Sequence, residues 1–255
     1  MTGRDSGAEI VELGSVPGFV VFDLPGAPLS AGGTRLAPDV SVAEVAVLAR
    51  SMTYKFAALG ERVGGGVARE VARRGGRVAA VSTVAGCVAD PAGLDVDRLL
   101  TLRQAHGDAC VLGYGRPVMP PHQLFTEVDA EVLVPGTRPG AIDAQTARSL
   151  PPGVRVIAPA ANAPYTETGA KVLRQRGIVA LPDFVCNAGA VIGYRSAADA
   201  APDQVLAAVE ARIGELIRAA LGHPGGPLAG ACEQAGGFLR SWWGDPPGPP
   251  FAPAQ

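Results

Sequence analysis

Three short apolar runs in the second half of the chain constrain the fold more than any other feature. They cover residues 132–135, 154–158 and 178–181, and each is followed by a turn that contains Gly, Pro or Asn. Helical patterns separate the runs. Apolar runs that alternate with helices predict parallel strands joined by crossover helices. The sequence therefore predicts an α/β fold on a parallel sheet, with a further strand of that sheet near residues 77–82.

Composition excludes several classes of protein. Hydrophobic residues make up 47% of the 255 residues, which is enough for a buried core, and aromatic residues only 5%, so that core must be mostly Ala, Val and Leu. A net charge of −2 without a basic block argues against a nucleic-acid partner. No run has the length of a signal-peptide core or a membrane span. We expect a soluble, cytoplasmic protein without a membrane partner.

The four cysteines predict free thiols. They are widely spaced and form no C-x-x-C pair, as expected of a protein in a reducing compartment. Together with the three histidines they show none of the usual zinc-ligand spacings, so no metal site is expected.

The chain divides into four predicted segments. Ser41 and Glu44 form a capping box that starts a helix, and a second long helix is expected over 202–221. The predicted segments are a shortened N-terminal lobe over 1–60, the sheet domain over 61–200, C-terminal helices over 201–243, and a disordered Pro-rich tail over 244–255.

The order of short motifs resembles the glutamate/leucine/phenylalanine/valine dehydrogenase family, with the leucine/valine branch closer than the glutamate branch. The motifs are GGTR, MTYKFA, a strand that ends in V-P, A-A-N-A-P, L-P-D-F and N-A-G-A-V-I. This resemblance implies a Rossmann-like dinucleotide-binding domain with a truncated substrate-type lobe. It also implies NAD or NADP as cofactor and an amino or 2-oxo (keto) acid as ligand. Roughly a hundred residues of the family's usual length are absent between the two domains.

The resemblance assigns the substrate carboxylate to Lys55, with Gly32 and Gly33 as backbone lining beside it. A carboxylate needs a desolvated cation, and lysine supplies a point charge with three donors. We expect Lys55 at the exposed rim of a cleft, where it contributes little to stability. The alternative is a surface lysine whose stem lies along an amphipathic helix.

The family's catalytic lysine and aspartate fall in or beside the missing region. Lys55 and Lys171 are the only lysines of the chain. The sequence therefore offers no candidates for the catalytic residues.

The dinucleotide fingerprint is incomplete. It requires a strand, then G-x-G-x-x-G opening a helix, then an acidic residue about 20 residues on. Gly60 and Gly64 fit, but Glu61 near the middle glycine would repel a pyrophosphate, and Thr83 stands at the place of the acid. Thr83 can still bind a ribose or leave room for the 2′-phosphate of NADP, with several arginines nearby. The alternative is that these glycines form a flexible junction between two elements.

Other turns are placed by the resemblance at the nicotinamide end of the cofactor. Pro135, Thr137 and Asn162 are candidates for contacts to the nicotinamide ribose, and Asn187 begins the turn that approaches the nicotinamide. Val191 falls where apolar groups line the substrate side-chain pocket. The alternative makes these residues ordinary turn and core positions.

Three functions are compatible with the sequence. The first is an amino-acid dehydrogenase for an apolar L-amino acid or its 2-oxo or imino acid, impaired or altered by the missing catalytic pair. The second is a repurposed non-redox enzyme, and the third is a non-catalytic accessory protein. Because the lobe through which family members assemble is shortened, we expect a monomer or dimer.

Overall fold

The computed structural model describes residues 9–12, 19–23, 41–58, 77–194, 196, 200–245 and 248–252. Near the N-terminus, strands β1 (Glu9–Glu12) and β2 (Phe19–Phe22) form an antiparallel pair. Helix α1 (Val42–Ala58) follows. The amide of Glu44 donates to Ser41 Oγ at 3.2 Å, which confirms the predicted start of this helix.

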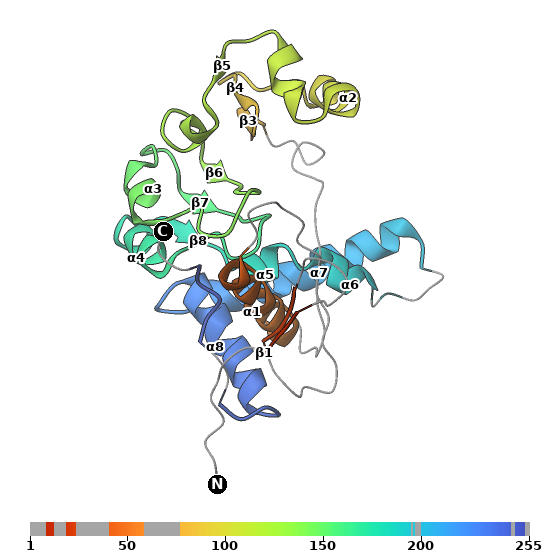
Figure 1. Ribbon diagram of the computed structural model, residues 1–255, viewed down its shortest axis with the longest axis vertical. Coiled ribbons are helices and arrows are strands. Elements are labelled where there is room, and N and C mark those ends of the chain that lie inside the picture. Colours follow the sequence, from red (N-terminus) through yellow and green to blue (C-terminus); the bar gives the residue numbers. More distant parts are fainter. Residues whose placement is uncertain are drawn as a thin grey trace.

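A parallel sheet forms from the three apolar runs, as the sequence predicts. Its strands are β6 (Val132–Leu133), β7 (Val156–Ile157) and β8 (Val179–Ala180), in that spatial order. Helices α3 (Ala144–Ser149) and α4 (Glu167–Gln175) form the two crossovers (Figure 1). The core beside this sheet consists of Leu133, Ile142, Ala147, Leu150, Val154, Ile157, Tyr165, Val172, Leu173 and Ile178.

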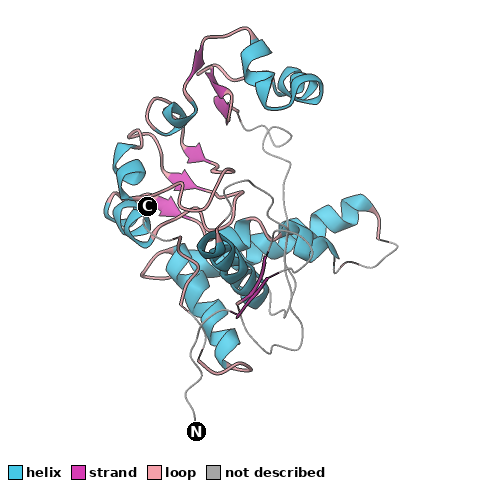
Figure 2. Cartoon of the chain, viewed as in Figure 1, coloured by secondary structure: helices cyan, strands magenta, loops and turns pink. Residues whose placement is uncertain are grey.

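The strand expected near 77–82 does not join the parallel sheet, so that part of the prediction is wrong. Strand β3 (Ala80–Thr83) pairs antiparallel with β4 (Gly86–Ala89), which pairs with β5 (Val118–Met119). Figure 2 shows this second sheet apart from the parallel one. Helix α2 (Val96–His106) and the 3-10 segments η2 (Gly107–Tyr114) and η3 (Pro121–Phe125) complete this part of the molecule.

The physical reason lies in the strand order of doubly wound sheets. Their first strand lies between the second and the fourth. In this chain the expected first strand would end just before Gly60. The residues at that place belong instead to the last turn of α1, which continues to Ala58. Among the described residues no parallel neighbour pairs with β3, and its hydrogen-bond partners come from the hairpin that follows it.

Helices cover the other side of the molecule. They are α5 (Asp183–Cys186), α6 (Gly189–Tyr194), α7 (Pro202–Leu221) and α8 (Pro227–Arg240), and the bounds of α7 agree with the prediction. Helix α1 packs against α8 and α5 (Figure 1). None of the helices in the described part of the chain is long and apolar enough to cross a membrane.

Part of the predicted disordered tail is ordered. Ala252 is 5% exposed, and its amide donates to the carbonyl of Tyr165 at 2.9 Å. The carbonyl of Gly248 accepts from Arg50 of α1 at 3.1 Å. The prediction is therefore wrong for residues 248–252, because backbone hydrogen bonds and the packing of Phe251 hold them against the sheet domain.

Candidate functional site

Polar side chains converge beyond the carboxyl ends of β7 and β8, where ligands bind in open α/β sheets. Asn162 comes from the turn after β7, and Asn187 follows α5, which itself follows β8. Lys55 reaches the same place from α1. Its Nζ donates to Asn162 Oδ1 at 3.0 Å, and Asn187 Nδ2 donates to the same oxygen at 2.8 Å.

Lys55 is not at a rim, which corrects the prediction from the sequence. Its side chain is fully covered, with a residue exposure of 1%. Burial lowers the pKa of Lys55 from 10.5 to about 8, and the charge of Asp183 opposes this shift. The cause is that α1 packs directly on α5 and α8.

Asp183 was missed by the sequence reasoning, although it is part of the L-P-D-F motif. It is 1% exposed, and its Oδ2 accepts from Ser51 Oγ at 2.9 Å and from the amide of Ala163 at 2.7 Å. Burial raises the pKa of Asp183, while these two hydrogen bonds and the Lys55 charge lower it. Ser51, also missed, precedes Lys55 by one helical turn, a spacing that places both on one face of α1.

Asn187 has one unsatisfied group. The residue is 2% exposed, and its Nδ2 contacts Asn162 and, at 3.4 Å, the carbonyl of Ala160. Its Oδ1 is buried and has no hydrogen-bond partner among the described residues. A buried acceptor without a partner is rare in folded proteins and marks a place where a ligand donor would fit.

Pro135 lies beside the Asn162 turn, because its carbonyl accepts from the amides of Ala160 and Ala161 at 3.0 Å each. Thr137, two residues further on, is exposed. Val191 lies on α6 and is 2% exposed. The structure thus brings together Lys55, Asn162, Asn187 and the Pro135 turn.

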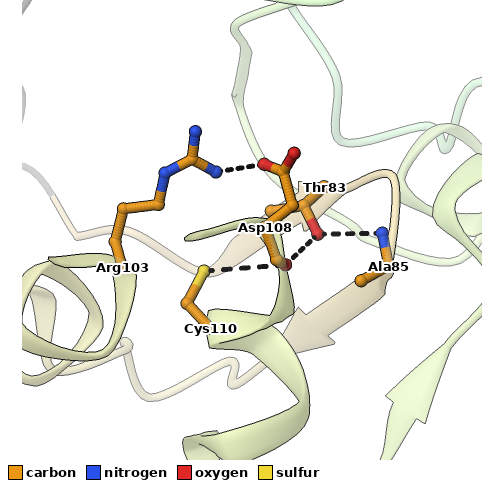
Figure 3. Close-up of polar contacts among 5 residues, drawn as sticks. All are labelled: Thr83, Ala85, Arg103, Asp108 and Cys110. Carbon is orange, nitrogen blue, oxygen red and sulfur yellow. Dashed lines mark hydrogen bonds and ion pairs between the residues drawn. The ribbon is translucent and has the colours of Figure 1, made fainter. Parts of the chain in front are cut away.

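Thr83 belongs to the other sheet and is not part of this cluster. Its hydroxyl donates to the carbonyl of Asp108 at 2.7 Å and accepts from the amide of Ala85 at 3.1 Å (Figure 3). Arg103 pairs with the Asp108 carboxylate in the same network. These contacts give Thr83 a structural role at the β3–β4 turn, and its contact with a cofactor stays a prediction.

The four glycines assigned from the sequence, Gly32, Gly33, Gly60 and Gly64, lie outside the described residues. Their roles stay predictions. A surface cavity of about 570 Å³ lies between α7 and α8, with His223, Glu233 and Arg240 in its lining, and none of the predicted site residues borders it.

Two family profiles match the sequence. The profile described as glutamate/leucine/phenylalanine/valine dehydrogenase matches residues 59–202, which is more than half of the chain. The profile of the dimerisation domain of the same family matches residues 26–71.

Relatives that the chain resembles include glutamate dehydrogenases. One from Thermotoga maritima is 32% identical over 46% of this chain and 27% of its own length. An NADP-specific one from Saccharolobus shibatae is 29% identical over 72% of this chain and 45% of its own length. The chain thus spans less than half of either relative, and neither of them supports the leucine/valine branch over the glutamate branch.

A solved structure shows the same fold. It is a hetero-hexameric glutamate dehydrogenase from Thermus thermophilus in a leucine-bound form, with a TM-score of 0.53 and 23% identity, over 75% of this chain and 52% of the other. The order of strands β6 to β8, the cluster at their carboxyl ends and the profile over residues 59–202 lead to one conclusion. The chain belongs to the glutamate/leucine/phenylalanine/valine dehydrogenase family.

Proposed function

We propose that this protein binds an apolar L-amino acid, or the corresponding 2-oxo or imino acid, as a dehydrogenase-type oxidoreductase with NAD or NADP. The observation that carries the proposal is the buried Lys55 ammonium, which faces Asn162 and Asn187 at the carboxyl ends of the parallel strands. A cation at that place, screened from water, is the group that a ligand carboxylate requires. The carboxylate would take over from Asn162 Oδ1 as the acceptor for Lys55.

The charges of the cluster favour an apolar side chain over a second carboxylate. A dicarboxylic ligand would need a second cation, and among the described residues Lys55 is the single cation of this hydrogen-bonded cluster. Asp183 adds a negative charge beside it, which would repel a second carboxylate. Val191, buried on the helix that follows Asn187, would be an apolar wall for the ligand's side chain.

The nicotinamide end of a cofactor fits the residues of this site. The Oδ1 of Asn187, which has no partner among the described residues, needs a hydrogen-bond donor. A ribose hydroxyl or the carboxamide N–H of the nicotinamide could supply it. Asn162 and the Pro135 turn would hold the same end, and Gly60, Gly64, Thr83 and Thr137 are the further contacts proposed from the sequence. When bound, the cofactor would exchange a hydride with the carbon that carries the amino group.

The chain's own residues would then perform three tasks. Lys55 fixes the carboxylate, and so the direction in which the reacting carbon points. Asn187 and Asn162 orient the two ligands relative to each other. The packing of α1 on α5 excludes water from the cluster. No described residue stands in the place of the family's catalytic lysine or aspartate, so we expect slow turnover compared with complete family members.

A second function is binding without a redox step, either as a repurposed enzyme or as an accessory protein. The separation of β3 from the parallel sheet favours it, because the adenosine half of a dinucleotide normally lies along the first strands of that sheet, and β6 to β8 are its only strands in the described part of the chain.

The test separates the two functions. NADH and NADPH are titrated while cofactor fluorescence is followed, and reductive amination of 4-methyl-2-oxopentanoate is compared with that of 2-oxoglutarate. We expect cofactor binding, slow turnover and preference for the apolar oxo acid. Asn187→Ala should weaken cofactor binding about tenfold, the value of one hydrogen bond in a buried site. Binding of the oxo acid without any cofactor signal would support the second function.

We also expect a monomer or a dimer in solution. In this chain the lobe matched by the dimerisation profile covers only residues 26–71. Multi-angle light scattering at several protein concentrations gives the mass directly. A stable hexamer would contradict this expectation and would require an assembly surface in the sheet domain or the C-terminal helices.

A further inference from the structure

Asp183 contacts both segments that form the Lys55–Asn162 contact, although no hypothesis from the sequence assigns it a role. Its Oδ2 binds Ser51 of α1 and the amide of Ala163, the residue after Asn162. Ser51 lies one turn before Lys55 on the same helix. The two hydrogen bonds therefore fasten both sides of the Lys55–Asn162 contact to one carboxylate.

The turn that carries Asn162 needs such a support. Ala163 has a φ of 47°, the left-handed region that residues with a Cβ rarely adopt. Such a conformation persists only where surrounding contacts hold it, and it is found most often at functional sites. The 2.7 Å hydrogen bond from the Ala163 amide to Asp183 is a contact of this kind.

We propose that Asp183 is the positioning residue of this site: it holds α1 and the Asn162 turn together, and its negative charge keeps the Lys55 ammonium charged. The importance of Lys55 rests on the proposed function, but the coupling between the two residues does not. Asp183 does not touch the ligand in this proposal. It acts through Lys55 and Asn162.

Other charged or titratable groups near Lys55 have weaker claims to this role. Helix α5 also presents Cys186 and α8 presents Cys232, and burial together with the charge of Asp183 raises the pKa of each thiol to about 12, so both are neutral near pH 8. Burial and the charge of Asp183 also raise the pKa of the Tyr165 hydroxyl. On the side of β2, Asp23 is already paired with Arg50. Among the described residues, Asp183 is the charge that acts on Lys55.

The composition of the chain allows a direct test, because Lys55 and Lys171 are its only lysines. With ¹³C-labelled lysine, the Cε resonances of both are followed by NMR between pH 5 and 11. Lys171 is exposed and serves as the internal reference, and Lys171→Arg assigns the two signals. In the wild type, the Lys55 signal should titrate near pH 8.

Asp183→Asn removes the charge and keeps an oxygen for the Ser51 and Ala163 donors. We expect the Lys55 midpoint to fall by about one to three pH units, the effect of losing an opposite charge nearby, while Lys171 stays unchanged. Ser51→Ala removes one contact and keeps the charge, so it should loosen α1, seen as faster amide exchange, without lowering the Lys55 midpoint.

An unchanged Lys55 midpoint in Asp183→Asn would overturn the proposal, since a merely structural aspartate would alter stability alone. If Asp183→Asn does not fold, Asp183→Ser makes the same charge change in a smaller side chain and is held to the same criterion. The experiment contains no ligand. Failure of 4-methyl-2-oxopentanoate to bind the wild type would therefore contradict the proposed function and leave this inference standing.

Discussion

Lys55→Met should abolish binding of 4-methyl-2-oxopentanoate without lowering the stability of the protein at pH 7. Loss of one partner of a desolvated charge pair costs about 2–5 kcal/mol of binding free energy, or roughly thirtyfold to several thousandfold in affinity. Methionine fills nearly the same volume, so it opens no cavity. Isothermal titration calorimetry measures the affinity, and urea unfolding at pH 7 measures the stability.

The expected stability follows from the buried charge. A pKa lowered from 10.5 to about 8 means that the ammonium is less stable in the folded protein than in water. The variant removes that cost but also the hydrogen bond to Asn162, and Asn162 Oδ1 keeps its contact with Asn187. The balance predicts equal or higher stability, up to about 3 kcal/mol. A functional group that lowers stability is common in binding sites.

Lys171→Met is the matched control. The Lys171 side chain is 67% exposed and pairs with Glu167 on the surface of α4, so neither affinity nor stability should change beyond about 0.5 kcal/mol. Unchanged affinity in Lys55→Met would refute the carboxylate role of Lys55. A large loss of stability in Lys55→Met would instead identify it as a structural residue.

Much of the fold could be predicted because it depends on local signals. The apolar runs predicted β6, β7 and β8. The Ser41–Glu44 capping box predicted the start of α1, and Pro202 predicted the start of α7. The position of β3 could not be predicted in this way. It depends on whether a neighbouring strand exists, and the apolar residues 56–58 fit the end of a helix as well as the start of a strand.

The site could be predicted only in part, for a related reason. Motif order led to Lys55, Asn162 and Asn187, which the structure brings into one cluster. Burial of Lys55 and the role of Asp183 depend on how closely α1 approaches α5, and no residue pattern encodes that distance. The Ser51–Asp183 hydrogen bond joins residues 132 positions apart in the sequence. Such a contact becomes visible only once the helices are packed.

The contribution of Lys55 to stability and the affinity for an oxo acid should change in opposite directions between pH 8 and 10.5. Folded Lys55 loses its proton near pH 8, whereas in the unfolded chain it keeps the proton up to about pH 10.5. In that window the unfolded state binds more protons, so the contribution of Lys55 to stability rises with pH. The cost of the buried ammonium, about 3 kcal/mol for two and a half pH units, is fully present below pH 8.

Other titratable groups lower the stability as the pH rises, so the effect of Lys55 must be measured as the difference in stability between the wild type and Lys55→Met. The folded-state pKa values of Tyr54, Cys186 and Cys232 are raised to about 12, and their contributions to stability are lost as the pH rises above about 9. Subtracting the urea-unfolding free energies of Lys55→Met from those of the wild type cancels these terms. This difference should shift by about 3 kcal/mol in favour of the wild type between pH 7.5 and 10.5.

Affinity should follow the ammonium itself. Above pH 8 each pH unit removes about nine tenths of the remaining charged Lys55, so the affinity of the wild type for 4-methyl-2-oxopentanoate should fall about tenfold per unit. The ligand stays fully ionised over this range, because a carboxylic acid loses its proton far below pH 7. Affinity that stays constant to pH 10, together with a stability difference that does not move, would show that Lys55 keeps an ordinary pKa and is not buried in solution.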